Sequence, residues 1–142
     1  LNSDSPTLPG AVLEAAAAAL ARPGDRLVLG PALDGGYYLI GLKQAHAQVF
    51  RHISWSTPHV FQQTVRAAAT LRLPVTRLPP WYDVDDLAGL HLLLDELFGA
   101  GAPPAVGGVK GAPACRSRQY LRQLLDSPDA ARLEFSSPLR GG

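Results

Sequence analysis

Two kinds of apolar run alternate along the chain: runs with helical spacing, and short continuous runs bounded by turn residues. The first of them, residues 11–25, is rich in Ala and Leu and therefore favours a helix. Thr7 or Ser5 can cap the start of this helix, with Pro9 in its first turn. A Pro-Gly pair near the end of the run stops it.

Three short runs are typical of strands, because they are rich in residues that favour β-structure and are bounded by Gly, Pro or Asp: residues 26–30, 37–42 and 74–79. Between and after them, apolar residues at helical spacing predict further helices: at 45–50, from Pro58 onward, at 83–101 and at 116–127. This alternation of helices and strands predicts an α/β domain. Because three or four strands are few for a complete doubly wound sheet, we also expect that a first βα portion is missing.

Composition excludes several classes of protein. The chain has 142 residues, 46% hydrophobic and 18% charged, which is typical of one globular domain. A net charge of +1 gives no support for binding to nucleic acid or to a membrane surface. No run approaches the roughly 18 apolar residues that would span a bilayer. The single cysteine favours a reducing compartment, so we expect a cytoplasmic protein.

Polar residues that could carry chemistry gather in three places. The first, residues 2–9, contains Asp4 on an acidic turn that looks like the end of a strand. A carboxylate there lies on the ligand-binding edge of an open parallel sheet. The simpler interpretation is that Asp4 or Ser5 only caps the helix that follows.

The second place is the loop before residues 37–42, where Asp34 precedes Gly35 and Gly36. Adjacent glycines permit backbone conformations, or a close approach to a ligand, that a side chain would prevent. An ordinary Asp-Gly turn explains the same residues.

The third place is WYDVDD, residues 81–86. Asp83 and Asp85 are two residues apart, so in an extended segment they point to the same side, as two ligands of a hard divalent cation would. The alternative is that these carboxylates, with Asp86, only complement the dipole of the following helix.

Four segments taken in order carry a resemblance: SDSPTLP, LGPALDGGYYLIGL, ISWST and LPPWYDVDDLAGL. Together they resemble the small bacterial transferases described as glycosyltransferase-like or nucleotide-diphospho-sugar transferase-like, among them radical-SAM/selenodomain-associated and arsenosugar-biosynthesis transferases. The resemblance is strong from residue 2 to about residue 95 and weaker over the helix expected at 116–127. It implies an α/β, Rossmann-like GT-A fold with three layers, of which the nucleotide-binding N-terminal part is expected to be missing.

The resemblance also implies roles for individual residues. Asp4 and Asp85 would bind a divalent metal, Mg²⁺ or Mn²⁺, with their carboxylates within about 5 Å of a common point. Asp34 and Asp83 would be catalytic. The residues expected to bind substrate are Ser3, Gly35, Gly36, Tyr37 and Trp55. DVDDL is shorter than the usual family form, which leaves open which of Asp83, Asp85 and Asp86 contacts the metal.

The expected function is that of a metal-dependent transferase with a nucleotide-activated, NDP-sugar-like donor as its small-molecule partner. One alternative is a guanylyltransferase-like nucleotidyltransferase that releases pyrophosphate. Another is a non-catalytic remnant that binds a partner or dimerises. Residues 1–99 are expected to be the C-terminal part of the transferase domain, followed by a linker (100–114), a closing helix (115–127) and a weakly ordered tail (128–142). A homodimer, or pairing with the missing N-terminal half, is expected.

Overall fold

The computed structural model describes residues 1–99 and 108–133. Helices and strands alternate through most of the described chain, in this order: α1 (Gly10–Ala21), β1 (Leu27–Pro31), β2 (Tyr37–Leu42), η1 (Ala47–Phe50), α2 (Val60–Thr70), β3 (Val75–Arg77), α3 (Leu87–Phe98), α4 (Cys115–Leu125) and η3 (Pro128–Leu133). The expected α/β class is confirmed. No described helix has both the length and the apolar character that crossing a bilayer requires.

The sheet has three strands in the order β2-β1-β3 and is mixed. β1 pairs antiparallel with β2, from Leu27 opposite Leu42 to Pro31 opposite Tyr37, and it pairs parallel with β3. An isolated parallel bridge between Ala32 and Trp81 extends the β1–β3 alignment beyond the last regular pair. This bridge brings the end of β1 beside the segment that leads into α3.

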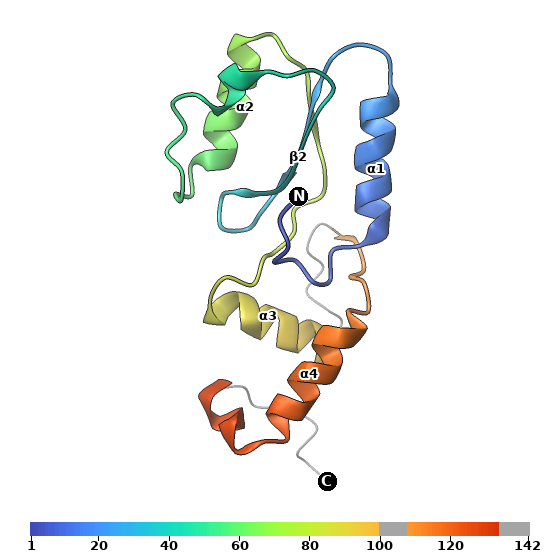
Figure 1. Ribbon diagram of the computed structural model, residues 1–142, viewed down its shortest axis with the longest axis vertical. Coiled ribbons are helices and arrows are strands. Elements are labelled where there is room, and N and C mark those ends of the chain that lie inside the picture. The colour runs from blue at the N-terminus through green and yellow to red at the C-terminus, as the bar shows by residue number, and fades with distance from the viewer. Residues whose placement is uncertain (100–107, 134–142) are drawn as a thin grey trace.

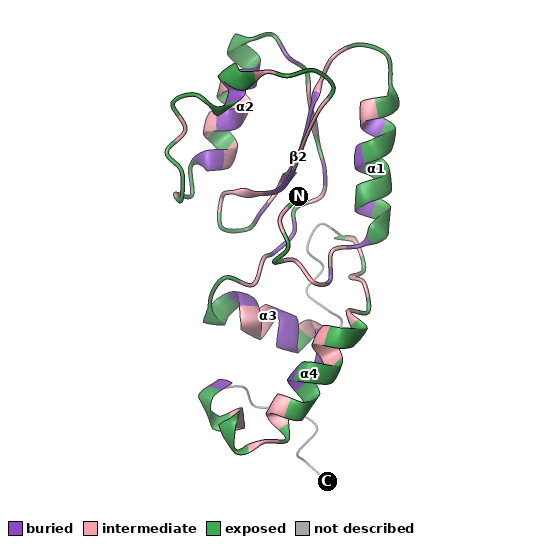
Figure 2. Cartoon of the chain, in the orientation of Figure 1, coloured by how far each residue is buried: buried purple, intermediate pink, exposed green. Residues whose placement is uncertain are grey.

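Both faces of the sheet are covered, so successive side chains of the central strand β1 are buried on opposite faces. Val28 packs in one cluster with Val12 and Ala16 of α1. Its neighbours Leu27 and Leu29 pack in the other cluster, with residues of η1 and α2. Figure 1 shows α1 and α2 on opposite sides of the sheet, and in Figure 2 the buried residues of α1 lie on its sheet-facing side. The result is a helix–sheet–helix arrangement of three layers.

A glycine in β1 makes room for an aromatic ring on the neighbouring strand. Tyr38 of β2 lies so close to Gly30 that a Cβ at position 30 would overlap the phenol ring. The Tyr38 hydroxyl then donates to the carbonyl oxygen of Pro79 at 2.8 Å. This bond ties the sheet to the beginning of the segment that precedes α3.

The predicted helix ends differ from the observed ones at their N-termini. Pro9 is the N-cap of α1 rather than a first-turn residue, and no side chain caps this helix. Thr7 is instead fully buried, with its hydroxyl bonded to that of Tyr82 at 2.9 Å. Ser5 bonds to Asn2, so the capping interpretation of Thr7 and Ser5 is wrong.

A second helix begins later than its proline suggested. α2 starts at Val60, two residues after Pro58, with His59 as its N-cap and no side chain that caps it. The Thr57 hydroxyl donates to the carbonyl of Ser54 at 2.7 Å. Residues 54–59 therefore form a loop in front of α2.

The C-terminal helix packs on α3. Arg118 and Arg122 of α4 each lie over the ring of Phe98, at 5.5 and 5.7 Å from its centroid, and Leu121 joins the same core cluster as α3. η3 occupies the beginning of the segment that was expected to be a weakly ordered tail. Parts of the expected linker and tail, residues 100–107 and 134–142, lie outside the described residues.

Candidate functional site

Three carboxylates from two segments meet at one end of the sheet. Asp34 lies in the loop between β1 and β2, whereas Asp83 and Asp85 lie in the segment between β3 and α3. One carboxylate oxygen of each residue lies within 4.8 Å of the others. Asp34 and Asp85 are exposed and Asp83 is half-buried. We refer to Asp34, Asp83 and Asp85 as the carboxylate group.

The loop that carries Asp34 is an Asx turn. Its carboxylate accepts the backbone N–H of Gly36 at 2.8 Å, while the N–H of Gly35 bonds to Ala32. The Asp-Gly turn considered from the sequence is therefore present, and the same turn places Asp34 in the carboxylate group. The two interpretations of this loop are compatible.

Gly35 joins this turn to the start of α2. Its φ of 92° lies in the left-handed region, and a Cβ at this position would overlap the carbonyl oxygen of Pro58. The N–H of Phe61 also donates to the carbonyl of Gly35 at 2.9 Å. Any side chain at position 35 would push the turn away from α2 and would displace the neighbouring Asp34.

Residues 81–86 are held on both sides before α3 begins. Trp81 bonds through its backbone to Pro31 and Leu33, and the N–H of Val84 donates to the carbonyl of Asp4 at 2.9 Å. Asp86 is the N-cap of α3, with its carboxylate accepting the N–H of Gly89 at 2.8 Å. Asp86 therefore lies at the N-terminus of the following helix, as the dipole alternative expected, whereas Asp83 and Asp85 join Asp34.

A buried hydroxyl network supports the same segment from behind. The Tyr82 hydroxyl donates to a carboxylate oxygen of Glu96 in α3 and is also bonded to Thr7. Burial, more than any other factor, raises the pKa of Tyr82, so the phenol stays protonated and can donate. This fixes the residue next to Asp83 against both α3 and the N-terminal segment.

Negative charge is concentrated at the carboxylate group. Partial burial raises the pKa of Asp83, followed by repulsion from the negative charge of Asp34, and Asp85 and Asp4 add smaller contributions of the same sign. A backbone hydrogen bond opposes the shift without cancelling it. The ionised carboxylates therefore repel one another, and a cation bound between them would reduce this repulsion.

The structure places Asp4 differently from the expected metal site. Its carboxylate is outside the carboxylate group, and it accepts a bond from the hydroxyl of Ser3 at 3.2 Å. Its backbone carbonyl, rather than its side chain, contacts the segment before α3. The residue that meets Asp85 from another segment is Asp34, because the β1–β2 turn reaches this edge. The role of Asp4 and Asp85 as the pair that shares a cation stays a prediction.

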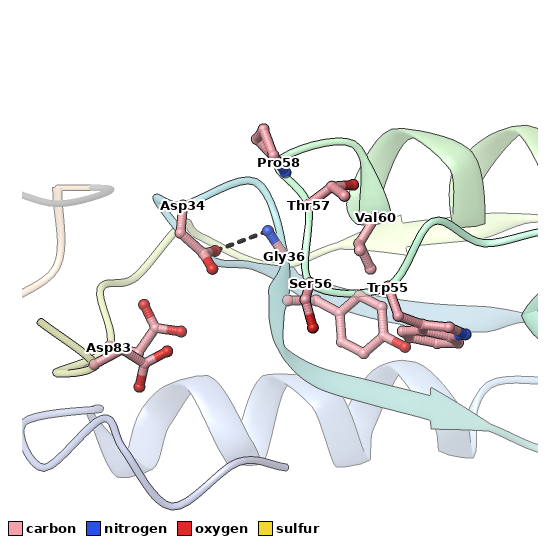
Figure 3. A pocket seen from close by; sticks show the side chains of 10 residues that line it. Asp34, Gly36, Trp55, Ser56, Thr57, Pro58, Val60 and Asp83 are labelled. Carbon is pink, nitrogen blue, oxygen red and sulfur yellow. Dashed lines mark hydrogen bonds between the residues drawn. The ribbon is translucent and has the colours of Figure 1, made fainter.

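A pocket of about 490 Å³ opens beside the carboxylate group (Figure 3). Three of the residues expected to bind substrate line it: Gly36, Tyr37 and Trp55. Its far wall comes from the loop before α2. Ser3 and Gly35 do not line it.

Apart from Trp55, the residues of the loop before α2 were not expected to bind substrate. Ser56, Thr57 and Pro58 line the pocket, and Ser56 has a φ of 60°, which is unusual for a residue other than glycine. In the sequence, Ser56 and Thr57 belong to the ISWST segment of the resemblance and Pro58 to the expected start of a helix, and none of the three was assigned a role in the site. Their role in the pocket depends on the contact between Gly35 and Pro58, which no local pattern reveals.

Comparison with known proteins points to one class. Residues 1–57 match a family model described as "Uncharacterized protein conserved in bacteria (DUF2064)". The chain is also similar to a crystal structure of a "putative nucleotide-diphospho-sugar transferase" from Desulfovibrio desulfuricans G20, with 32% sequence identity and a TM-score of 0.62. The alignment covers 85% of this chain and 51% of that one, so the chain spans about half the length of the solved structure. No curated protein matches the sequence.

The structural similarity covers most of this chain. It supports the glycosyltransferase-like class that the motifs suggested, and the mixed sheet with helices on both faces agrees with that class. The resemblance to nucleotide-diphospho-sugar transferases predicted from the sequence, and the α/β fold that it implied, are confirmed.

Proposed function

We propose that this chain carries the metal-binding and sugar-binding part of a transferase that uses a nucleotide-activated sugar as its donor. The observation that carries this proposal is the convergence of three carboxylates from separate segments at the edge of a pocket. The structural similarity to a nucleotide-diphospho-sugar transferase supports it. The exposed free thiol of Cys115 supports a reducing, cytoplasmic location as part of the same proposal.

The carboxylate group has the chemistry that Mg²⁺ or Mn²⁺ requires. Both are hard cations that bind carboxylate oxygens, and three carboxylates within 4.8 Å of one another repel each other until a cation neutralises them. Asp34, Asp83 and Asp85 would hold the ion. When bound, the ion would neutralise negative charge on the diphosphate of the donor.

The other residues of the pocket would bind and orient the sugar. Tyr37 and Trp55 offer aromatic faces for the C–H groups of a pyranose ring. The hydroxyl of Ser56 can donate to or accept from the sugar hydroxyls, whereas that of Thr57, which donates to Ser54, can only accept. In the proposed reaction, the acceptor oxygen bonds to the anomeric carbon of the sugar. The bond from that carbon to the diphosphate breaks, its electron pair leaves with the nucleoside diphosphate, and the acceptor proton passes to solvent.

A titration with Mn²⁺, followed by electron paramagnetic resonance, tests the metal site. We expect one bound Mn²⁺ per chain and at least tenfold weaker binding for Asp34→Asn and Asp85→Asn. Glu14→Gln, on the exposed part of α1, is the matched control, and Asp4→Asn tests the ligand that the resemblance implies. Unchanged binding in Asp34→Asn together with lost binding in Asp4→Asn would refute the proposed ligands.

Product analysis tests the reaction class. The chain is incubated with UDP-glucose, GDP-mannose or GTP in the presence of Mg²⁺ or Mn²⁺, and the released phosphates are separated. Release of a nucleoside diphosphate from a sugar donor supports glycosyl transfer. Release of pyrophosphate from GTP, with no turnover of the sugar donors, would replace this proposal by nucleotidyl transfer.

A further inference from the structure

A second hollow lies on the other side of the carboxylate group. Its volume is about 360 Å³, and it lies against the beginning of α3. Among the residues that line the two hollows, those in common are Asp34, Asp83 and Asp85. The carboxylate group therefore lies between the two hollows and is accessible to a ligand in either one.

The two hollows differ in the rest of their lining. The first adds two aromatic rings and two hydroxyls to the carboxylates, as described above. The second adds the apolar side chains of Leu33, Ala88 and Leu92. Its ring, Tyr82, contributes little polarity, because the hydroxyl is bonded to other residues on the far side.

The remaining acidic residue of the second hollow is also engaged. Asp86 lines it, but its carboxylate accepts the N–H of Gly89 as the cap of α3. The polar groups that a ligand in this hollow can reach are therefore mainly those of the carboxylate group. A ligand that fits has one polar atom near the carboxylates and an apolar body beside the leucines.

Leu33 marks the rim of this hollow. Its side chain is 55% exposed, although its backbone N–H is bonded to the carbonyl of Trp81 at 3.1 Å. A single exposed leucine is ordinary on a protein surface. Here it lies directly beside Asp34, in a fixed turn, where a bound apolar group would cover it and remove apolar surface from water.

We propose that the second hollow binds the acceptor, and that the acceptor is an alcohol whose hydroxyl is attached to an apolar group. This inference rests on the proposed function, in which the first hollow binds the sugar of the donor. The two substrates then meet at the shared carboxylates. The oxygen of the acceptor hydroxyl then replaces the diphosphate at the anomeric carbon of the sugar.

Binding measured by nuclear magnetic resonance tests the assignment without requiring turnover. Benzyl alcohol serves as the acceptor probe and methyl β-D-glucopyranoside as the sugar probe, each titrated into the full chain with Mg²⁺ present. We expect benzyl alcohol to shift the methyl signals of Leu33 and Leu92, and the glucoside to shift the indole N–H signal of Trp55.

Variants separate the two hollows. Leu33→Gln should weaken benzyl alcohol binding at least about threefold, as expected from the loss of one apolar contact, and should leave the glucoside unaffected. Trp55→Ala should do the reverse. Leu13→Gln is the matched control, because Leu13 is 38% exposed on α1 and lines neither hollow. Dispersed spectra show that each variant is folded.

The outcomes distinguish this inference from the proposed function. The acceptor assignment is overturned, and the transferase proposal remains, if Mn²⁺ binds at the carboxylate group but benzyl alcohol shifts the Trp55 signal. The same conclusion follows if benzyl alcohol shifts the Leu92 signals as strongly, and binds as tightly, in Leu33→Gln as in the wild type. The same holds if benzyl alcohol shifts no signal. If Mn²⁺ does not bind, the proposed function and this inference both fail.

Discussion

Replacing Asp83 by Asn should stabilise the protein while weakening its affinity for metal. Asp83 lies within 4.8 Å of two other carboxylates, and burial together with their charge raises its pKa. Two unit charges 4.8 Å apart repel by about 0.9 kcal/mol in a water-like medium, because two of the three groups are exposed. Two such pairs, reduced by about half through screening at 0.15 M salt, give roughly 1 kcal/mol.

For a chain of 142 residues this corresponds to a rise in Tm of about 3 °C. The sign of the pH dependence follows from the raised pKa. The folded state binds the Asp83 proton more tightly than the unfolded state, so the charge begins to cost stability as the pH rises above about 4, the ordinary pKa of an aspartate. The cost is complete above the raised pKa. The advantage of Asn should therefore be full at pH 7 and vanish as the pH falls below about 4.

Thermal unfolding of wild type and Asp83→Asn at pH 7 and pH 3.5 measures this effect, with 1 M NaCl as a further condition. Salt should shrink the difference, and Mg²⁺ should stabilise the wild type more than the variant. Glu14→Gln, which removes a carboxylate from the exposed part of α1, should not change Tm by a comparable amount. A lower Tm for Asp83→Asn at pH 7, or a gain that is equal at both pH values, would refute the electrostatic reasoning.

Three further substitutions test the supports of the site. Gly35→Ala should lower the free energy of unfolding, measured in urea, by about 3 kcal/mol through backbone strain and overlap with Pro58. Gly24→Ala should lower it by about 1 kcal/mol, because φ is also positive there but the nearest atom is 4.0 Å away. Equal losses in the two variants would contradict the overlap. Tyr82→Phe should lower the free energy of unfolding by about 1–3 kcal/mol, because its buried partners lose a hydrogen bond, whereas Tyr120→Phe, on the surface, should hardly change it. Similar losses in the two variants would contradict the hydroxyl network around Tyr82. Trp55→Phe should remove most of the fluorescence that acrylamide quenches, and persistent quenching would place Trp55 inside the protein.

The sequence predicted the strands and helices well because each run had its own local signal. β2 was expected at residues 37–42 and is observed there, since its β-favouring residues are bounded by glycines and a lysine. The helix starts were less predictable. Thr7 looked like a cap, but its hydroxyl is bonded to Tyr82, which is 75 positions away in the sequence. A local pattern carries no information about such a partner.

The site was predicted in part for the same reason. The alternation of Asp83 and Asp85 correctly suggested two carboxylates on one side of an extended segment. Their third neighbour is Asp34 rather than Asp4, because the β1–β2 turn docks on α2 through Gly35. That contact depends on the tertiary packing of the turn. The catalytic and metal roles of these residues, and the homodimer or pairing with an N-terminal half, stay predictions.

The contact between Gly30 and Tyr38 has a consequence for how this protein can vary. A side chain at position 30 requires a smaller residue at position 38, so the two positions should change together among relatives and in engineered variants. Such a double change would also remove the hydroxyl that bonds to Pro79. The strand pair would then lose one of its bonds to the segment that carries Asp83, while the backbone bonds of Trp81 to Pro31 and Leu33 remain. A covarying pair in the middle of the sheet is thus linked to the position of a carboxylate at its edge.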